Sequence, residues 1–412
     1  MTQETLHIDL DRLLARIDRL GEVGALEGGG VCRLALSPED KEARDLVVSW
    51  MRSLGLTVTV DAIGNVIAVR RGRRDGPPVM TGSHIDSVAT GGLYDGSLGV
   101  LAGLEVIETL NDAGIETEHP VAVAFFTNEE GARFAPDMMG SLVFVGGLGL
   151  EEALSTSGID GETVRDCLER IGYRGDVHNG SAEVRAFVEL HVEQGPVLES
   201  EGITLGAVER VQGISWTEVT IAGVSNHAGT TPMALRRDTG HAAALLACEV
   251  RGIADDIGGD QVGTVGAMTL RPNLINVIAN QAVVTVDLRN TDDKALQEAE
   301  RRLARFLDGL RGQGFDVATR LLARFDPVDF DRRVVAMVES TAKALGHSVK
   351  RMPSGAGHDA QMLARVCPAG MIFVPSKDGI SHNVREFTEP GAIGTGANVL
   401  LQVLLELAGE TA

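Results

Sequence analysis

The chain has 412 residues and a formal net charge of −21, with 44% hydrophobic and 23% charged residues. This length suits two domains better than one core, and the composition is that of a folded globular protein rather than a disordered one. The acidity argues against a nucleic-acid partner, because nucleic-acid phosphates require clustered Lys and Arg.

The N-terminus and the cysteines together predict a cytoplasmic protein. The first 20 residues show no apolar run behind a basic start, so no secretory signal is expected. An uninterrupted run of about 18 apolar residues is also missing, which argues against a membrane span. The cysteines are widely spaced, without a CxxC pair: Cys32, Cys167, Cys248 and Cys367. This spacing is typical of free thiols in a reducing compartment.

The first half of the chain alternates amphipathic helices with apolar strands. A helix begins after Ser37, which can cap it, with Pro38 at the first helical position, and it ends at Gly55. Strands are predicted over 56–60, 65–70, 78–83, 121–127 and 186–192, and a second helix over 98–113. Continuous apolar strands between helices indicate a sheet covered on both faces, the α/β class.

The segment from about 211 to 325 has a different order of elements. The expected elements are strand 215–222, helix 235–253, strands 263–271 and 275–289, helix 293–310 and strand 315–323. This β-α-β-β-α-β order is the split βαβ pattern of a ferredoxin-like α+β domain. Afterwards α/β alternation returns, with helices 332–345, 359–366 and 392–407 and strands 347–352 and 370–374. We therefore expect a domain formed by 1–210 and 326–412, with 211–325 inserted into it.

Histidines and carboxylates gather at the ends of predicted strands, where open α/β sheets place ligands. His84 follows strand 78–83, and in an extended chain Asp86 would point to the same side. Asp86 could then accept the second ring N–H of a metal-bound His84 and support it. The alternative is a solvated strand-end histidine beside a capping aspartate.

Two further clusters carry carboxylates. Asp95 stands between glycines that let the backbone approach a ligand closely, although it could equally be the N-cap of helix 98–113. Glu129 and Glu130 follow an apolar strand directly. Two acids at a buried strand end need a cation to offset the cost of desolvation. One of them can bind metal while the other acts as a base.

The remaining candidates are His191 and Gln194, which follow strand 186–192, and His382 near the C-terminus. His191 suits a metal and Gln194 offers an amide to a substrate; a half-buried strand with alternating polar residues is the alternative. Together the clusters supply three histidines and at least three carboxylates, which fit two divalent ions sharing a carboxylate. Mixed nitrogen and oxygen ligands without cysteine favour Zn, Mn, Co or Ni.

The chain resembles the hydantoinase/carbamoylase branch of the metal-dependent aminoacylase and carboxypeptidase superfamily. The resemblance rests on motifs that occur in order between about residue 30 and residue 390: SHIDS, GGLYDG, FTNEEGARF, LHVEQGP, SNHAGTTPM, RPNLINVI, DLRN, SGAGHDA and SHNVRE. It implies a di-metal catalytic domain with a mixed sheet flanked by helices. It also implies that the inserted domain mediates dimerisation and acts as a lid.

The resemblance assigns roles to the residues that match these motifs. It implies one metal held by His84, Asp95 and His191 and another held by Asp95, Glu130 and His382, with Asp95 bridging. Glu129 matches the general base. Peptidases of the superfamily usually have a carboxylate in place of His191, so the histidine is typical of the carbamoylase branch.

In the inserted domain, the resemblance implies three substrate contacts. His227 matches a residue that reaches the partner subunit's active site and stabilises the oxyanion, which implies a homodimer. Asn276 and Arg289 match residues that bind the carboxylate of the substrate. A guanidinium pairs well with a carboxylate, but without the resemblance Arg289 would be interpreted as a surface charge at a strand end.

We therefore expect hydrolysis of the ureido C–N bond of an N-carbamoyl-L-amino acid, with release of ammonia and carbon dioxide. Allantoate amidohydrolase and β-ureidopropionase activities are alternatives, because their substrates also combine a carboxylate with a ureido group. An N-acyl-amino-acid amidase or dipeptidase is a second alternative, against which His191 argues. A metal-stabilised binding or scaffold protein is the non-enzymatic alternative; Glu129 argues against it, since a structural site needs no spare base.

Overall fold

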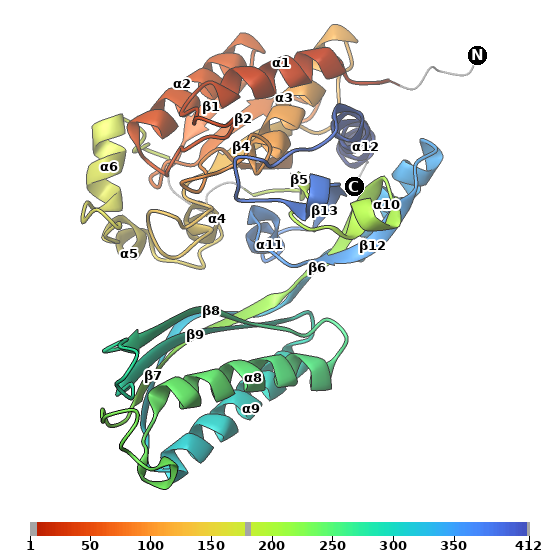
Figure 1. Ribbon diagram of the computed structural model, residues 1–412. Helices are drawn as coiled ribbons and strands as arrows, with labels where there is room; N and C mark the ends of the chain where they lie inside the picture. Colours follow the sequence, from red (N-terminus) through yellow and green to blue (C-terminus); the bar gives the residue numbers. More distant parts are fainter. Residues whose placement is uncertain (1–5, 178–182, 410–412) are drawn as a thin grey trace. The chain divides into compact units, whose positions relative to one another are not determined.

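The computed structural model describes residues 6–177 and 183–409, so part of the N-terminal segment considered for a signal lies outside the described residues. The chain forms two compact units, one of Met1–Glu209 with Asp329–Ala412 and one of Arg210–Val328 (Figure 1). The smaller unit is thus a single insertion into the larger. The observed boundaries of the smaller unit fall after Glu209 and after Val328, whereas the sequence placed them after residues 210 and 325.

The larger unit is built on a nine-stranded mixed sheet in the order β1-β2-β4-β3-β5-β13-β6-β11, with β12 beside β6. Its strands are β1 Thr57–Val60, β2 Val66–Arg70, β3 Val79–His84, β4 Val121–Phe126, β5 Ala186–Val192, β6 Leu205–Val211, β11 Val328–Asp329, β12 Val349–Ser354 and β13 Ala369–Val374. The central strands β4, β3, β5 and β13 are parallel and buried along their length. The expected α/β class with a mixed sheet is confirmed.

Helices flank this sheet. They are α1 Leu10–Gly21, α2 Pro38–Ser53, α3 Ser97–Asp112, α4 Met139–Phe144, α5 Leu150–Leu154, α6 Val164–Ile171, α7 Val197–Glu201, α10 Arg332–Ala344, α11 Asp359–Leu363 and α12 Pro390–Gly409. Ser37 caps α2 as expected, because its hydroxyl accepts the N–H of Asp40. The sequence interpretation missed α1, whose buried stripe is only Leu13, Ile17 and Leu20.

Among the described residues, α12 is the one helix whose length and composition would allow it to cross a membrane. Within its most apolar stretch, 61% is buried inside the structure. It packs against α3 and against strands β5 and β13. Burial of this kind is typical of a helix in the core of a folded domain.

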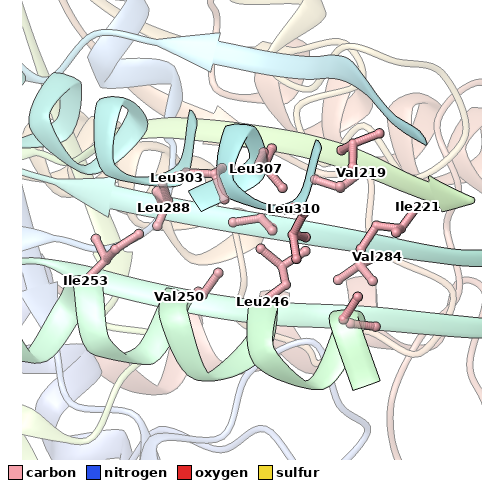
Figure 2. Packing of buried hydrophobic residues seen from close by; sticks show 14 of the residues in the cluster. Val219, Ile221, Leu246, Val250, Ile253, Val284, Leu288, Leu303, Leu307 and Leu310 are labelled. Atoms are coloured by element: carbon pink, nitrogen blue, oxygen red, sulfur yellow. The ribbon is translucent and has the colours of Figure 1, made fainter. Parts of the chain in front are cut away.

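The smaller unit has the predicted ferredoxin-like order, with an antiparallel sheet arranged β10-β7-β9-β8. Its elements are β7 Gly213–Ala222, α8 Thr239–Ile257, β8 Val262–Arg271, β9 Gln281–Asn290, α9 Asp293–Gly312 and β10 Asp316–Phe325. Figure 2 shows how side chains from α8 and α9, such as Leu246 and Leu307, pack on β9 residues Val284 and Leu288. Alternate residues of β9 therefore point away from the helices.

Two boundaries in this unit differ from the prediction. The helix expected from residue 235 begins at Thr239, because the Asp238 carboxylate accepts the N–H groups of Gly240 and His241 and caps it there. The strand expected from residue 275 begins at Gln281. The apolar residues before it belong to a loop in which Asn273 has a φ of 56°.

Candidate metal centre

The expected metal ligands of the larger unit converge at the carboxyl ends of neighbouring parallel strands. His84 ends β3, Glu129 and Glu130 follow β4, and His191 is the last residue but one of β5. Asp95 comes from the loop before α3, and His382 from the loop after β13. The shared edge of the parallel strands explains why residues distant in sequence meet here.

A first triad consists of the buried residues His84, Asp95 and His191. The Oδ1 atom of Asp95 lies 3.2 Å from Nε2 of His191 and 3.7 Å from Nε2 of His84. The Nδ1 atom of each ring lies 2.9 Å from a backbone carbonyl oxygen, that of Asp86 for His84 and that of Val192 for His191. These contacts orient both rings so that Nε2 faces the carboxylates, as metal-binding histidines require.

A second triad consists of Asp95, Glu130 and His382. The Nε2 atom of His382 lies 3.3 Å from Oδ2 of Asp95 and 3.2 Å from Oε2 of Glu130. The His382 side chain is 51% exposed, whereas the other ligands of both triads are largely covered. This triad is therefore the more accessible of the two.

Asp95 belongs to both triads, with Oδ1 facing one and Oδ2 facing the other. The candidate ligand atoms within each triad all lie within 4.8 Å of one another. Gly96, rather than Asp95, is the N-cap of α3, so the plain capping alternative does not hold. A Cβ atom on Gly96 would lie 2.3 Å from Nε2 of His84, so this close approach requires glycine. The residues fit two divalent cations that share one carboxylate.

The electrostatics of the cluster also favour bound cations. Burial opposes ionisation of Asp95, but hydrogen bonds with His191 and His382 hold its pKa well below the usual value. Burial raises the pKa of Glu129 well above its usual value, and the negative charges of Asp359 and Glu130 raise it further. So many buried acids require positive charge between them, which divalent cations would supply.

Glu129 lies beside the first triad but belongs to neither of the two triads. Its Oε2 atom is 3.3 Å from Nε2 of His84, and the residue is 8% exposed. The Asp86 carboxylate accepts the backbone N–H groups of Glu129 and Glu130, at 3.3 Å each. Glu129 thus has a fixed backbone and a carboxylate at the edge of the ligand cluster, which suits a base.

The structure corrects the contact expected for Asp86. The ring of His84 meets the backbone oxygen of Asp86 rather than its carboxylate. The strand β3 ends at His84, two residues before Asp86, so the side-chain alternation of a paired strand need not extend to Asp86. Asp86 still supports the cluster, through the N–H groups that follow β4. Gln194 lies at the cluster as well, with Nε2 2.9 Å from Oδ2 of Asp95.

Sequence reasoning missed a buried polar layer beneath the ligands. The carboxylate of Glu189 accepts the Ser83 hydroxyl at 2.6 Å and the Ala360 N–H at 2.8 Å. The ring of His358 packs edge-on against His191, with 4.5 Å between the centroids. The alternation within β5 could have indicated Glu189, because it lies two residues before His191 and points to the same side.

Glu189, His191 and His358 also lie close enough to hold a metal. However, His191 already belongs to the first triad, and both Glu189 oxygens accept hydrogen bonds. Nε2 of His358 lies 2.9 Å from the Ser354 hydroxyl. We therefore interpret this group as packing that supports His191, not as a further metal site.

In the smaller unit, His227 and Asn276 lie side by side. A β-bridge joins His227 to Val277, and the Ala228 N–H donates to the Asn276 carbonyl at 3.0 Å. The Nδ1 atom of His227 accepts the N–H groups of Gly229 and Thr230, at 3.1 and 3.2 Å. The neutral ring must therefore carry its proton on Nε2, where it can be donated to a substrate oxygen.

Arg289 lies elsewhere in this unit. It is on β9, where its guanidinium pairs with Asp287, with Nη2 2.9 Å from Oδ2, and lies 5.7 Å from the Trp216 ring centroid. The path from Gln281 to Arg289 is eight residues of strand, about 27 Å, and Asn276 lies beyond Gln281. Arg289 therefore lies at the end of β9 opposite to the end that connects to Asn276.

Known proteins resemble this chain along most of its length. A model of peptidase family M20/M25/M40 matches residues 80–406. An N-carbamoyl-L-amino-acid amidohydrolase from Rhizobium meliloti is 40% identical over 407 residues, which is 98% of each chain. A ureidoglycolate hydrolase from Oryza sativa is 34% identical over 98% of this chain and 85% of its own. A crystal structure of a hydantoinase/carbamoylase family amidase from Burkholderia multivorans superposes with a TM-score of 0.95, at 46% identity, covering 99% of this chain and 100% of that one.

Proposed function

The chain belongs to the metal-dependent peptidase family M20/M25/M40, and on that premise we propose that it hydrolyses the ureido C–N bond of N-carbamoyl-L-amino acids. The proposal is carried by the position of Asp95, which contributes one carboxylate oxygen to each of two triads of candidate ligands. Glu129 lies beside these triads but belongs to neither of them. Full-length relatives at about 40% identity are amidohydrolases of N-carbamoyl-L-amino acids, which supports this substrate class.

The proposed cofactors are two divalent cations, chosen among Zn, Mn, Co and Ni by the mixed nitrogen and oxygen donors. His84, Asp95 and His191 would hold one, and Asp95, Glu130 and His382 the other. When bound, such ions polarise the scissile carbonyl and make a water molecule nucleophilic near neutral pH.

The residues of the chain then divide the remaining work. Glu129 accepts the proton of the attacking water and passes it to the leaving nitrogen, a role that suits a carboxylate with a raised pKa. The Nε2–H of His227 donates to the oxyanion that develops on the carbonyl oxygen. Gln194 holds the substrate beside Asp95. The products are the free amino acid, ammonia and carbon dioxide.

We further infer a homodimer. The strand β9 spans about 27 Å from Gln281 to Arg289, which exceeds the length of a small ureido acid. Asn276 precedes the Gln281 end of this strand, and His227 is bridged to its neighbour Val277. If all three contact one substrate, two copies of the chain must contribute to each site. All four cysteines are free, which supports a cytoplasmic location.

A substrate panel tests the proposed function. Purified protein loaded separately with Zn, Mn, Co or Ni is given N-carbamoyl-L-amino acids, β-ureidopropionate, allantoate, ureidoglycolate, an N-formyl-amino acid and a dipeptide, with ammonia or amine release as readout. We expect the highest kcat/KM on an N-carbamoyl-L-amino acid. A higher kcat/KM on another ureido acid would make that compound the substrate instead. A higher kcat/KM on the N-formyl-amino acid or the dipeptide would indicate an acyl-amino-acid amidase or a dipeptidase. Absence of hydrolysis with every metal would favour the scaffold alternative.

Arg289→Ala should raise KM for carboxylate-bearing substrates by about 10- to 100-fold, the effect of losing a charge-assisted hydrogen-bond pair. The Arg289 guanidinium lies over the Trp216 ring and pairs with the Asp287 carboxylate. Its surroundings therefore allow a carboxylate to approach it. Arg320→Ala is the matched control, since Arg320 pairs with Glu218 on the same sheet. An unchanged KM for an N-carbamoyl acid would remove Arg289 as the carboxylate anchor.

A further inference from the structure

Glu386 is a buried carboxylate in the loop between β13 and α12 that the proposed reaction does not use. It is 5% exposed. Its Oε1 atom accepts the backbone N–H groups of Tyr94, at 3.2 Å, and Asp95, at 3.1 Å. Its Oε2 atom accepts the Ser381 hydroxyl at 3.1 Å. Both oxygens are therefore directed at protein donors, so Glu386 is neither a metal ligand nor a base.

These hydrogen bonds join two loops that each carry a ligand. Glu386 and Asp95 are 291 positions apart in the sequence, and Ser381 is the neighbour of His382. His84 and His191 are held by the backbone ladders of β3 and β5. Asp95 and His382 lie outside regular secondary structure and lack such support.

Gly92 shows that the chain is shaped to admit this carboxylate. A Cβ atom on Gly92 would lie 2.3 Å from Oε1 and 2.4 Å from Cβ of Glu386. Gly92 does not have a positive φ, so its backbone conformation is open to any residue. The close approach of Glu386 therefore explains the glycine at this position.

We propose that Glu386 is a positioning residue of the metal centre, which fastens the Asp95 loop to the His382 loop and thereby sets the geometry of the second triad. The proposal rests on the proposed metal site but not on the identity of the substrate. It predicts a selective effect: the ion held by Asp95, Glu130 and His382 depends on Glu386, whereas the ion held partly by His84 and His191 depends on the strands.

The test measures zinc binding before activity. Wild type and Glu386→Ala are equilibrated in zinc-buffered solutions, and bound zinc is counted by mass spectrometry of the metal. We expect the second ion of Glu386→Ala to need about 10- to 100-fold more free zinc, the usual effect of removing a group that orients a ligand. The first ion, which also depends on Asp95, should weaken much less, because His84 and His191 stay in place. The kcat should fall at low zinc and recover as zinc rises.

Three further variants separate positioning from general stability. Glu386→Gln keeps an oxygen for the Tyr94 and Asp95 N–H groups, so its zinc binding should stay close to wild type. Gly92→Ala should displace the carboxylate and reproduce the selective loss. Glu389→Ala, at an exposed glutamate of the same loop, is the control and should bind both ions normally.

The outcomes are distinct. Two ions bound with wild-type affinity in Glu386→Ala would overturn the proposal, as would an equal loss of both ions. If Glu386→Ala does not fold, the zinc binding of Gly92→Ala is compared with that of Glu386→Gln. Selective loss of the second ion in Gly92→Ala alone supports the proposal, and equal zinc binding in the two variants overturns it. In a remaining outcome, wild type binds two ions and the variants lose one of them selectively, while wild type hydrolyses no ureido acid. That combination would refute the proposed function and leave the role of Glu386 intact.

Discussion

Glu129→Gln should lower kcat by about 10²- to 10⁴-fold, the usual contribution of a general base, while both metal ions stay bound. Glutamine keeps the size of the side chain but cannot take a proton from water. Glu129 belongs to neither ligand triad, and its contact with Asp86 is made by the backbone N–H, which the substitution preserves. KM should change little. Metal content, thermal unfolding and the rate of ammonia release are measured on the same preparation.

Glu130→Gln is the matched control for this experiment. The two glutamates are adjacent, but Glu130 belongs to the second triad, with Oε2 3.2 Å from His382. Its substitution should weaken the second ion, and raised metal concentration should restore part of the activity. A Glu129→Gln variant with near-normal kcat would exclude Glu129 as the base. A variant that loses metal instead would place Glu129 among the ligands.

Asp95→Asn should lower activity by about 10³-fold or more, because the polarisation supplied by bound ions contributes several kcal/mol and each 1.36 kcal/mol is tenfold in rate. The carboxylate faces both triads, with one oxygen each. An asparagine has one oxygen, so it can serve one triad, and its amide N–H groups repel a cation at the other. Bound metal per chain should fall from two ions to one.

Chelation provides the control for Asp95→Asn. Removing the metal from wild type should abolish activity and lower the melting temperature, since each ion at 100 times its Kd stabilises the folded state by about 2.7 kcal/mol. The melting temperature of Asp95→Asn should respond less to chelator, because fewer ions are bound. Two ions and a normal kcat in Asp95→Asn would show that the triads do not share this residue.

The strands that position the ligands were predictable because their signals are local. Apolar runs that end in polar residues predicted β3, β4 and β5 within one or two residues, and β5 over its observed range, Ala186–Val192. Parallel neighbours end at the same edge of a sheet, so histidines and acids after these strands were expected to meet. His84, Glu130 and His191 do lie in the cluster.

The loops were less predictable. The apolar stretch before Gln281 was interpreted as part of a strand over 275–289, which placed Asn276 and Arg289 on one continuous element. In the structure this stretch pairs instead with the loop around His227. The short apolar run does not reveal this outcome, because Ile278 is buried in the structure whereas Leu274 and Ile275 are exposed.

The sequence by itself determined the candidate ligand residues, the strand ends that carry them, the α/β class and the inserted ferredoxin-like unit, since residue type and hydrophobic period are local properties. Only the tertiary structure decided that Asp95 divides its oxygens between two triads, that the Asp86 carboxylate binds backbone N–H groups rather than a histidine ring, and that Glu386 reaches the Asp95 loop. These features depend on contacts between segments up to 291 positions apart, and the sequence pattern does not encode their atomic register.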